Sequence, residues 1–184
     1  MKDNTNKKIT DYIKELKPII KKYGLENDEN CIEAIKRIKN NDLMGYHSLV
    51  LFLYYNVELS SNEQQTIFET TKKAVENGLE NAWFCYGLLL LLGIGVQQDA
   101  NQGIFFTEQA FLKVFSKAFI QYPLESGKAQ ILYYFYNTFI WNLDSISNVT
   151  SLDEMKDIVY EISKCYNIVC WASEMASFLN GTAC

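Results

Sequence analysis

His47 is the only histidine in the chain, so any catalytic arrangement that needs an imidazole base depends on this residue. It lies in an apolar stretch, Tyr46-His47-Ser48-Leu49, that is typical of a helix. Base catalysis also needs positioned partners, and the sequence contains neither an H-E-x-x-H motif nor paired carboxylates in a glycine-rich loop. A position on a helix surface or in the core is therefore the favoured interpretation of His47. The sequence predicts a protein without enzyme activity and without catalytic residues.

The cysteines and glycines also lack the spacing of a cofactor or metal site. Gly93-Ile94-Gly95 has no third glycine for a dinucleotide and no Lys-Ser/Thr for a P-loop. The five cysteines match no zinc or redox motif; they are Cys31, Cys85, Cys165, Cys170 and Cys184. We expect no cofactor and no metal, and we interpret the thiols as the reduced cysteines of a cytoplasmic protein.

The charge balance restricts the class of partner. The chain carries 22 acidic and 17 basic residues, a net charge of −5. Phosphate binding needs a basic face, so we expect no nucleic-acid ligand. No small-molecule substrate is expected either, whereas a basic protein, such as a toxin or an enzyme, remains a possible partner.

An acidic stripe is the first candidate for a binding surface. Asp153, Asp157 and Glu161 recur every four residues, which places them on one face of a predicted helix. Like charges at this spacing destabilise a helix by roughly 0.2–0.5 kcal/mol per pair, although the helix N-terminus favours Asp153. The stripe is either a solvated face or a face for a basic protein.

Aromatic residues supply the second candidate. Six of them lie between residues 133 and 141, and Tyr54-Tyr55 and Trp83-Phe84 form earlier pairs. A helix with so many rings cannot bury every ring on one face. They either form a thick core or include anchors for a partner, since aromatic residues dominate binding hot spots. The anchors in the second interpretation are Tyr55, Phe84 and Tyr134.

The longest apolar run is too short for a membrane helix. It extends over 15 residues, from Ala82 to Val96. A helix of that length reaches only ~22 Å at the usual rise per residue, and a membrane span needs about 20 apolar residues. The N-terminal residues have no apolar segment of a signal peptide. We expect no membrane association and interpret the run as a buried core helix.

Apolar residues recur at helical spacing over most of the chain, and no alternating strand pattern persists. We therefore expect an all-α protein that forms one domain over residues 1–184. Pro18 should kink or shorten the first helix, because proline removes a backbone donor. The expected helices cover residues 7–23, 29–40, 42–56, 61–77, 80–93, 100–120, 127–142, 151–166 and 168–180.

Capping residues mark several helix ends. Ser60 or Ser61 precedes Glu63 at one start, and Ser151 with Glu154 has the spacing of a capping box. Left-handed caps are expected at Gly24, Gly78 and Gly181.

Residues 74–110 contain a pattern of small and aromatic residues: Ala74, Gly78, Ala82, Tyr86-Gly87, Gly93-Ile94-Gly95-Val96, Asp99, Gly103, Phe106 and Ala110. This pattern resembles a Sel1-like repeat, the α/α-solenoid unit related to tetratricopeptide repeats. This sequence departs from the usual residues of that repeat at four positions. It has Tyr86 in place of leucine, Leu90 in place of tyrosine, Gly103 in place of alanine and Phe106 in place of tryptophan. The resemblance implies a right-handed solenoid of antiparallel helix pairs. Fainter repeats are expected within residues 42–142, with residues 1–40 outside the resemblance and a C-terminal helix pair at 151–184.

The repeat pattern has a physical interpretation of its own. Ala82 and Gly87 are small where two helices should approach closely. Gly93 and Gly95 let the loop take positive φ, and Asp99 can cap the next helix.

The resemblance implies a scaffold or adaptor that binds several signalling or secretion partners, because such repeats present extended surfaces. The small size and acidic charge favour a single partner instead. Our preferred hypothesis is a non-enzymatic inhibitor that neutralises one cognate protein, as immunity proteins neutralise bacterial toxins.

Overall fold

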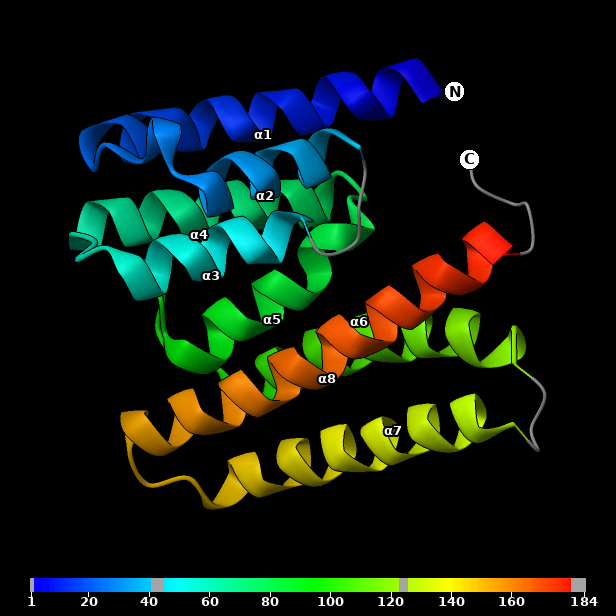
Figure 1. Ribbon diagram of the computed structural model, residues 1–184. Coiled ribbons are helices and arrows are strands. Elements are labelled where there is room, and N and C mark those ends of the chain that lie inside the picture. The colour runs from blue at the N-terminus through cyan, green and yellow to red at the C-terminus, as the bar shows by residue number, and fades with distance from the viewer. Residues whose placement is uncertain (1, 41–44, 123–125, 180–184) are drawn as a thin grey trace. The chain divides into compact units, whose positions relative to one another are not determined.

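The computed structural model describes residues 2–40, 45–122 and 126–179 (Figure 1). These residues form eight α-helices and three short 3₁₀ turns, and they contain no β-strand, which confirms the all-α prediction. The helices are α1 (Lys2–Lys22), α2 (Glu29–Lys39), α3 (Gly45–Asn56), α4 (Ser61–Glu76), α5 (Trp83–Leu92), α6 (Ala100–Ile120), α7 (Gly127–Ser145) and α8 (Leu152–Leu179).

The chain divides into two compact units, residues 1–107 and residues 108–184. In the first unit, α1 packs on α4, α2 packs on α3, and α4 packs on α5. In the second unit, α7 packs along α8 (Figure 1). The boundary falls within α6, whose first eight residues belong to the first unit.

Two predicted helix boundaries are wrong. The break predicted between residues 166 and 168 does not exist, because α8 is one helix of 28 residues. Asn167 has a weak helix propensity that costs well under 1 kcal/mol. The buried residues Ile162, Tyr166 and Val169 continue one apolar face through this point, so packing outweighs the local preference.

The first helix is also longer than predicted. It begins at Lys2 and continues through Pro18 to Lys22, so the proline does not shorten it. Proline inside a helix costs about 3 kcal/mol, but Leu16, Ile19 and Ile20 are buried on either side of it. Burying three such side chains contributes about 1.5–3 kcal/mol each, which exceeds that cost. The other helices lie at their predicted positions, with ends that differ by up to three residues.

The leucine-rich segment is the core helix α5. All residues from Phe84 to Leu92 are buried. Within the described part of the chain, no helix combines the length and the apolar character that a bilayer crossing requires.

The hairpin of α5 and α6 has the close approach expected at Gly87 and the positive φ expected at Gly93 and Gly95. A Cβ atom added at Gly87 would lie 2.6 Å from Cγ2 and 2.8 Å from the backbone nitrogen of Thr107 on α6. Gly93 and Gly95 both have left-handed φ, at 67° and 69°. Asp99 accepts a hydrogen bond from the Gln102 backbone N–H at 2.9 Å, which caps α6.

The capping predictions are mostly confirmed. Ser60 and Glu63 form a reciprocal capping box at the start of α4. At α8, Ser151 Oγ accepts from the Glu154 N–H at 3.2 Å, but the Glu154 carboxylate accepts from the Thr150 N–H at 2.9 Å. Left-handed glycines follow α1 and α4, at Gly24 and Gly78, while Gly181 lies outside the described residues.

The second unit is centred on a stacked aromatic pair. The rings of Phe111 on α6 and Phe139 on α7 are 3.7 Å apart between centroids and nearly parallel, at 9°. Both side chains are fully buried. The Tyr122 hydroxyl, beyond the end of α6, donates to the Ala172 carbonyl on α8 at 3.2 Å. These contacts join three helices of the second unit.

Candidate functional site

The predicted acidic stripe lies on an exposed face of α8 that also carries aromatic side chains. Asp153 and Asp157 are exposed, and Glu161 is half-buried. Tyr160 and Trp171, each 58% exposed, lie on the same face, because successive helix positions are separated by about 100°. We refer to these five residues as the α8 face. The predictions from the sequence omitted Tyr160 and Trp171, although Tyr160 follows Asp153 by two helical turns.

Lysines of the same helix partly neutralise the stripe. Lys156 Nζ lies 3.1 Å from an Asp153 carboxylate oxygen, and Lys164 Nζ lies 3.0 Å from a Glu161 oxygen. The hydrogen bond that Lys164 donates to Glu161 raises the pKa of Lys164, so this lysine stays protonated. Exposed pairs of this kind contribute about 0–1 kcal/mol and are easily exchanged. The pairs relieve the like-charge repulsion, so both interpretations of the stripe remain open.

The three predicted aromatic anchors have different environments. Tyr55 on α3 is 49% exposed and Tyr134 on α7 is 65% exposed, so both offer surface to a partner. Phe84 on α5 is fully buried, and its prediction as an anchor is wrong in this structure. The reason is packing: α5 is enclosed on nearly all sides, and the Phe84 ring lies edge-on against His47, 5.5 Å between centroids. Tyr55 belongs to the first unit and Tyr134 to the second.

The remaining aromatic residues of α7 divide between core and surface. Phe139 is fully buried, whereas Tyr133 and Trp141 are 55% and 70% exposed. The expectation that this helix could not bury every ring is confirmed.

His47 lies in the core, which is one of the two positions that the sequence favoured for it. Its side chain is 1% exposed on α3 and contacts Phe84. A side chain at this depth has no direct access to a substrate.

The described cysteines are buried and chemically quiet. Burial raises the pKa of the Cys85 thiol above its ordinary value and raises that of Cys165 to about 11. A protonated thiol is a poor nucleophile and a poor metal ligand. Among the residues that the structure describes, no three or more His, Cys, Asp or Glu side chains are grouped as a metal site would require.

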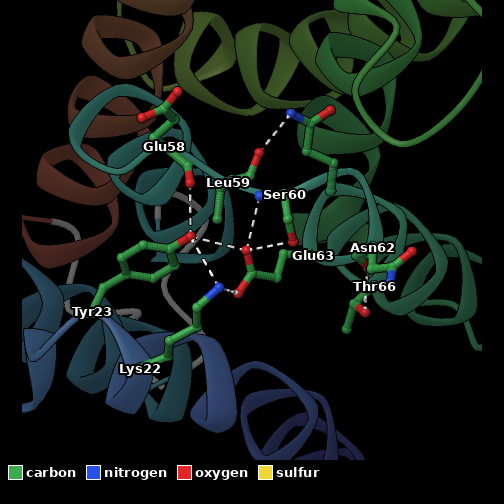
Figure 2. A network of polar contacts seen from close by, with 9 residues as sticks. Lys22, Tyr23, Glu58, Leu59, Ser60, Asn62, Glu63 and Thr66 are labelled. Carbon is green, nitrogen blue, oxygen red and sulfur yellow. Dashed lines mark hydrogen bonds and ion pairs between the residues drawn. The ribbon is translucent and has the colours of Figure 1, made fainter.

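A polar network connects the end of α1 to the start of α4 (Figure 2). Lys22 Nζ lies 2.7 Å from Glu63 Oε1, and the Tyr23 hydroxyl lies 2.9 Å from Glu63 Oε2. The Tyr23 hydroxyl also lies 2.7 Å from the Glu58 carbonyl, and Ser60 donates to Glu63 through its backbone and its hydroxyl. One carboxylate therefore caps α4 and holds α1 against it, which is a structural role.

The Glu63 network should make stability depend on pH. Its hydrogen bonds, from Lys22 first and then Ser60, lower the Glu63 pKa from 4.5 to about 2. A depressed carboxyl pKa stabilises the fold above pH 4.5, and the contribution is lost as the pH falls towards 2. The Lys22 pKa is raised, so the lysine side of the network persists up to pH 10.5.

We therefore expect the Glu63→Gln variant to be less stable than the parent at pH 7 and to converge with it between pH 4.5 and pH 2. Urea unfolding at a series of pH values measures this convergence. A stability difference that stays constant over the whole range would contradict the role given to the carboxylate.

An open polar groove of about 420 Å³ lies between α1 and α4. The buried Thr70 hydroxyl donates to Glu15 at 3.0 Å, and Lys73 Nζ lies 3.4 Å from the same carboxylate oxygen. Thr70 and Lys73 both bind the Glu15 carboxylate, so these polar groups serve the contact between α1 and α4. The groove is lined by Glu15, Asn62, Gln65, Thr66, Glu69, Thr70 and Lys73.

The surfaces described above expose aromatic and acidic side chains. The α8 face combines carboxylates with two half-exposed aromatic rings, and α7 exposes further rings. Such rings are typical of protein interfaces. We compared the chain with protein-family models, with curated proteins and with solved structures. None of the three comparisons found a match.

Proposed function

We propose that this chain is a non-enzymatic protein-binding module that neutralises one cognate protein, in the manner of an immunity protein acting on a bacterial toxin. The observation that carries the proposal is the α8 face, where the exposed ring of Tyr160 lies next to Asp157 and Trp171 is exposed further along the same face. Large rings that are half exposed are costly to leave in water, and a partner that covers them gains apolar burial.

The charge of the face favours a basic partner. The three carboxylates of the α8 face outnumber the two lysines that pair with them, Lys156 and Lys164. The whole chain has a net charge of −5. Complementary charge speeds association and discriminates between partners more than it raises affinity. A partner rich in lysine and arginine could replace the exposed ion pairs within α8 at little cost, because such pairs are weak.

For the fold, we propose a Sel1-like α/α-solenoid of antiparallel helix pairs. The support is local and comes from the α5–α6 hairpin, with its close crossing at Gly87 and its left-handed glycines at 93 and 95. We also propose a cytoplasmic location. In the described residues Cys31, Cys85 and Cys165 are buried thiols outside any disulfide, as a reducing compartment would leave them.

A toxin gene directly upstream would identify the partner to test. The inhibitor proposal expects one tight complex and protection of cells that express the toxin. A scaffold would instead capture several partners weakly. If the purified chain neither binds the neighbouring gene product nor protects against it, the inhibitor proposal is wrong.

Once a partner is in hand, the Asp157→Asn and Glu161→Gln double variant should associate more slowly at low salt. The slowing should disappear at 1 M salt, where a Debye length of about 3 Å removes electrostatic steering. Stopped-flow association rates over a salt series measure both effects. Asp144→Asn combined with Glu76→Gln removes two exposed carboxylates outside the α8 face and is the matched control. An unchanged rate for the double variant at low salt would leave the stripe as a solvated face.

A further inference from the structure

A stripe of exposed side chains runs along α7, on the face turned away from the described core of the second unit. Ile131, Tyr134, Thr138 and Trp141 follow one another at steps of three, four and three residues, the spacing with which one helix packs on another. Ile131, Tyr134 and Trp141 are 57%, 65% and 70% exposed. The core of this unit uses the opposite face of α7, where Phe139 is buried. We call these four residues the α7 stripe.

The α7 stripe carries no charge. All of α7 is described, and its only charged residues are Lys128 in the first turn and Asp144 in the last. The exposed positions beside the stripe are amides, Gln130 and Asn137. Such a surface offers nothing to select the basic partner proposed for the α8 face. It also lacks the like charge that would repel its own copy.

We propose that the α7 stripe packs antiparallel against the α7 stripe of a second copy of this chain. The stripe is centred at residue 136, so a two-fold axis there places Ile131 opposite Trp141 of the other copy. The same axis places Tyr134 opposite Thr138. Each large ring then meets a smaller side chain, which is the condition for filling a helix interface without gaps. A parallel pair would instead set Trp141 against Trp141 and Tyr134 against Tyr134.

The charged ends of α7 favour the same orientation. An antiparallel pair brings the Lys128 end of one copy to the Asp144 end of the other. A parallel pair would bring like charges together at both ends.

The exposed area of the α7 stripe is large enough for a specific interface only if both copies contribute the same patch. A whole aromatic side chain has roughly 150–250 Å² of surface. With the exposures of Tyr134 and Trp141, roughly 200–350 Å² of ring surface per copy is available. A two-fold contact buries the same patch on both copies. With Ile131 and the amides included, the total reaches about 1,000 Å², the lower limit of a specific interface.

Sedimentation velocity of the full chain over a concentration series tests the proposal without any other protein. We expect a reversible dimer. Tyr134→Gln and Trp141→Gln should each weaken it at least about tenfold, because every substitution removes an anchor from both copies. Trp171→Gln removes a ring from α8 that is also more than half exposed, and it should leave the dimer unchanged. All three side chains are more than half exposed, so the fold should be retained, as circular dichroism can verify.

A charge pair at Asn137 distinguishes a second copy from any other occupant. Asn137 is exposed beside the stripe and near the proposed two-fold axis, so it approaches its own copy. Asn137→Lys and Asn137→Glu should each weaken the dimer by like-charge repulsion, and mixing the two variants should restore it. Three results would overturn the proposal: a monomer at every concentration, a dimer that depends on Trp171, or no recovery on mixing. Because this experiment involves no cognate partner, its failure would leave the inhibitor proposal standing.

Discussion

Replacement of Gly87 by leucine is expected to lower the free energy of unfolding by about 3 kcal/mol or more. The reason is the crossing of α5 and α6. The Cβ atom alone would lie 2.6 Å from Thr107 Cγ2, 2.8 Å from the Thr107 nitrogen and 2.9 Å from the Gly103 carbonyl oxygen. Two of these three atoms belong to the backbone, so no change of rotamer relieves the contact and the helices must separate.

Gly127→Ala is the matched control for Gly87→Ala. Gly127 also lies in a helix, but a Cβ atom added there meets nothing within 4 Å. Alanine at Gly127 should therefore be neutral or stabilise by about 0.4–1 kcal/mol, while alanine at Gly87 should destabilise. Chemical denaturation of the three variants, with hydrogen exchange to locate the loss in α5 and α6, measures the difference. A Gly87→Leu protein as stable as the parent would remove the close-approach argument and the local support for a repeat hairpin.

Truncation of Phe139 to alanine is expected to cost about 3–5 kcal/mol, the range observed for buried phenylalanines. Phe139 is fully buried and stacks on Phe111, with ring centroids 3.7 Å apart. The variant loses the transfer free energy of a ring and leaves a cavity, and Phe111 loses its stacking partner. The loss should be confined to the helices of the second unit.

Tyr160→Ala is the control for the Phe139 variant. Tyr160 is an aromatic residue of the same unit, but it is 58% exposed and its ring contacts the Lys164 ammonium at 5.2 Å. Its truncation should cost under about 1 kcal/mol in stability, since an exposed cation–π contact contributes about 0.5–1 kcal/mol. Equal costs for the two truncations, measured by urea denaturation, would contradict the assignment of Phe139 to the core.

The local features of this fold were predictable because they depend on nearby residues. Helical periodicity depends on spacing along the chain, so most helices appear within three residues of their predicted ends. The capping box at Ser60 and Glu63 joins residues three positions apart. The left-handed conformation of Gly93 and Gly95 follows from their position after an apolar helix.

The candidate site was only partly predictable, because exposure depends on the packing of distant segments. Asp153, Asp157 and Glu161 share a face of α8 as their spacing requires. The spacing does not reveal that Lys156 and Lys164 pair with this stripe, or that Tyr160 and Trp171 are exposed on the same face of α8.

The sequence by itself determined that this protein is helical, where most helices begin and end, and that α5 is a core helix. Only the tertiary structure decided which aromatic rings are accessible. Phe84 and Tyr134 occur in similarly aromatic segments, yet Phe84 is enclosed and Tyr134 is 65% exposed. It also decided that α1 continues through Pro18 and that α8 continues through Asn167. In each case burial against a neighbouring helix contributes more free energy than the local preference of one residue, and the identity of that neighbour is not encoded in the local pattern.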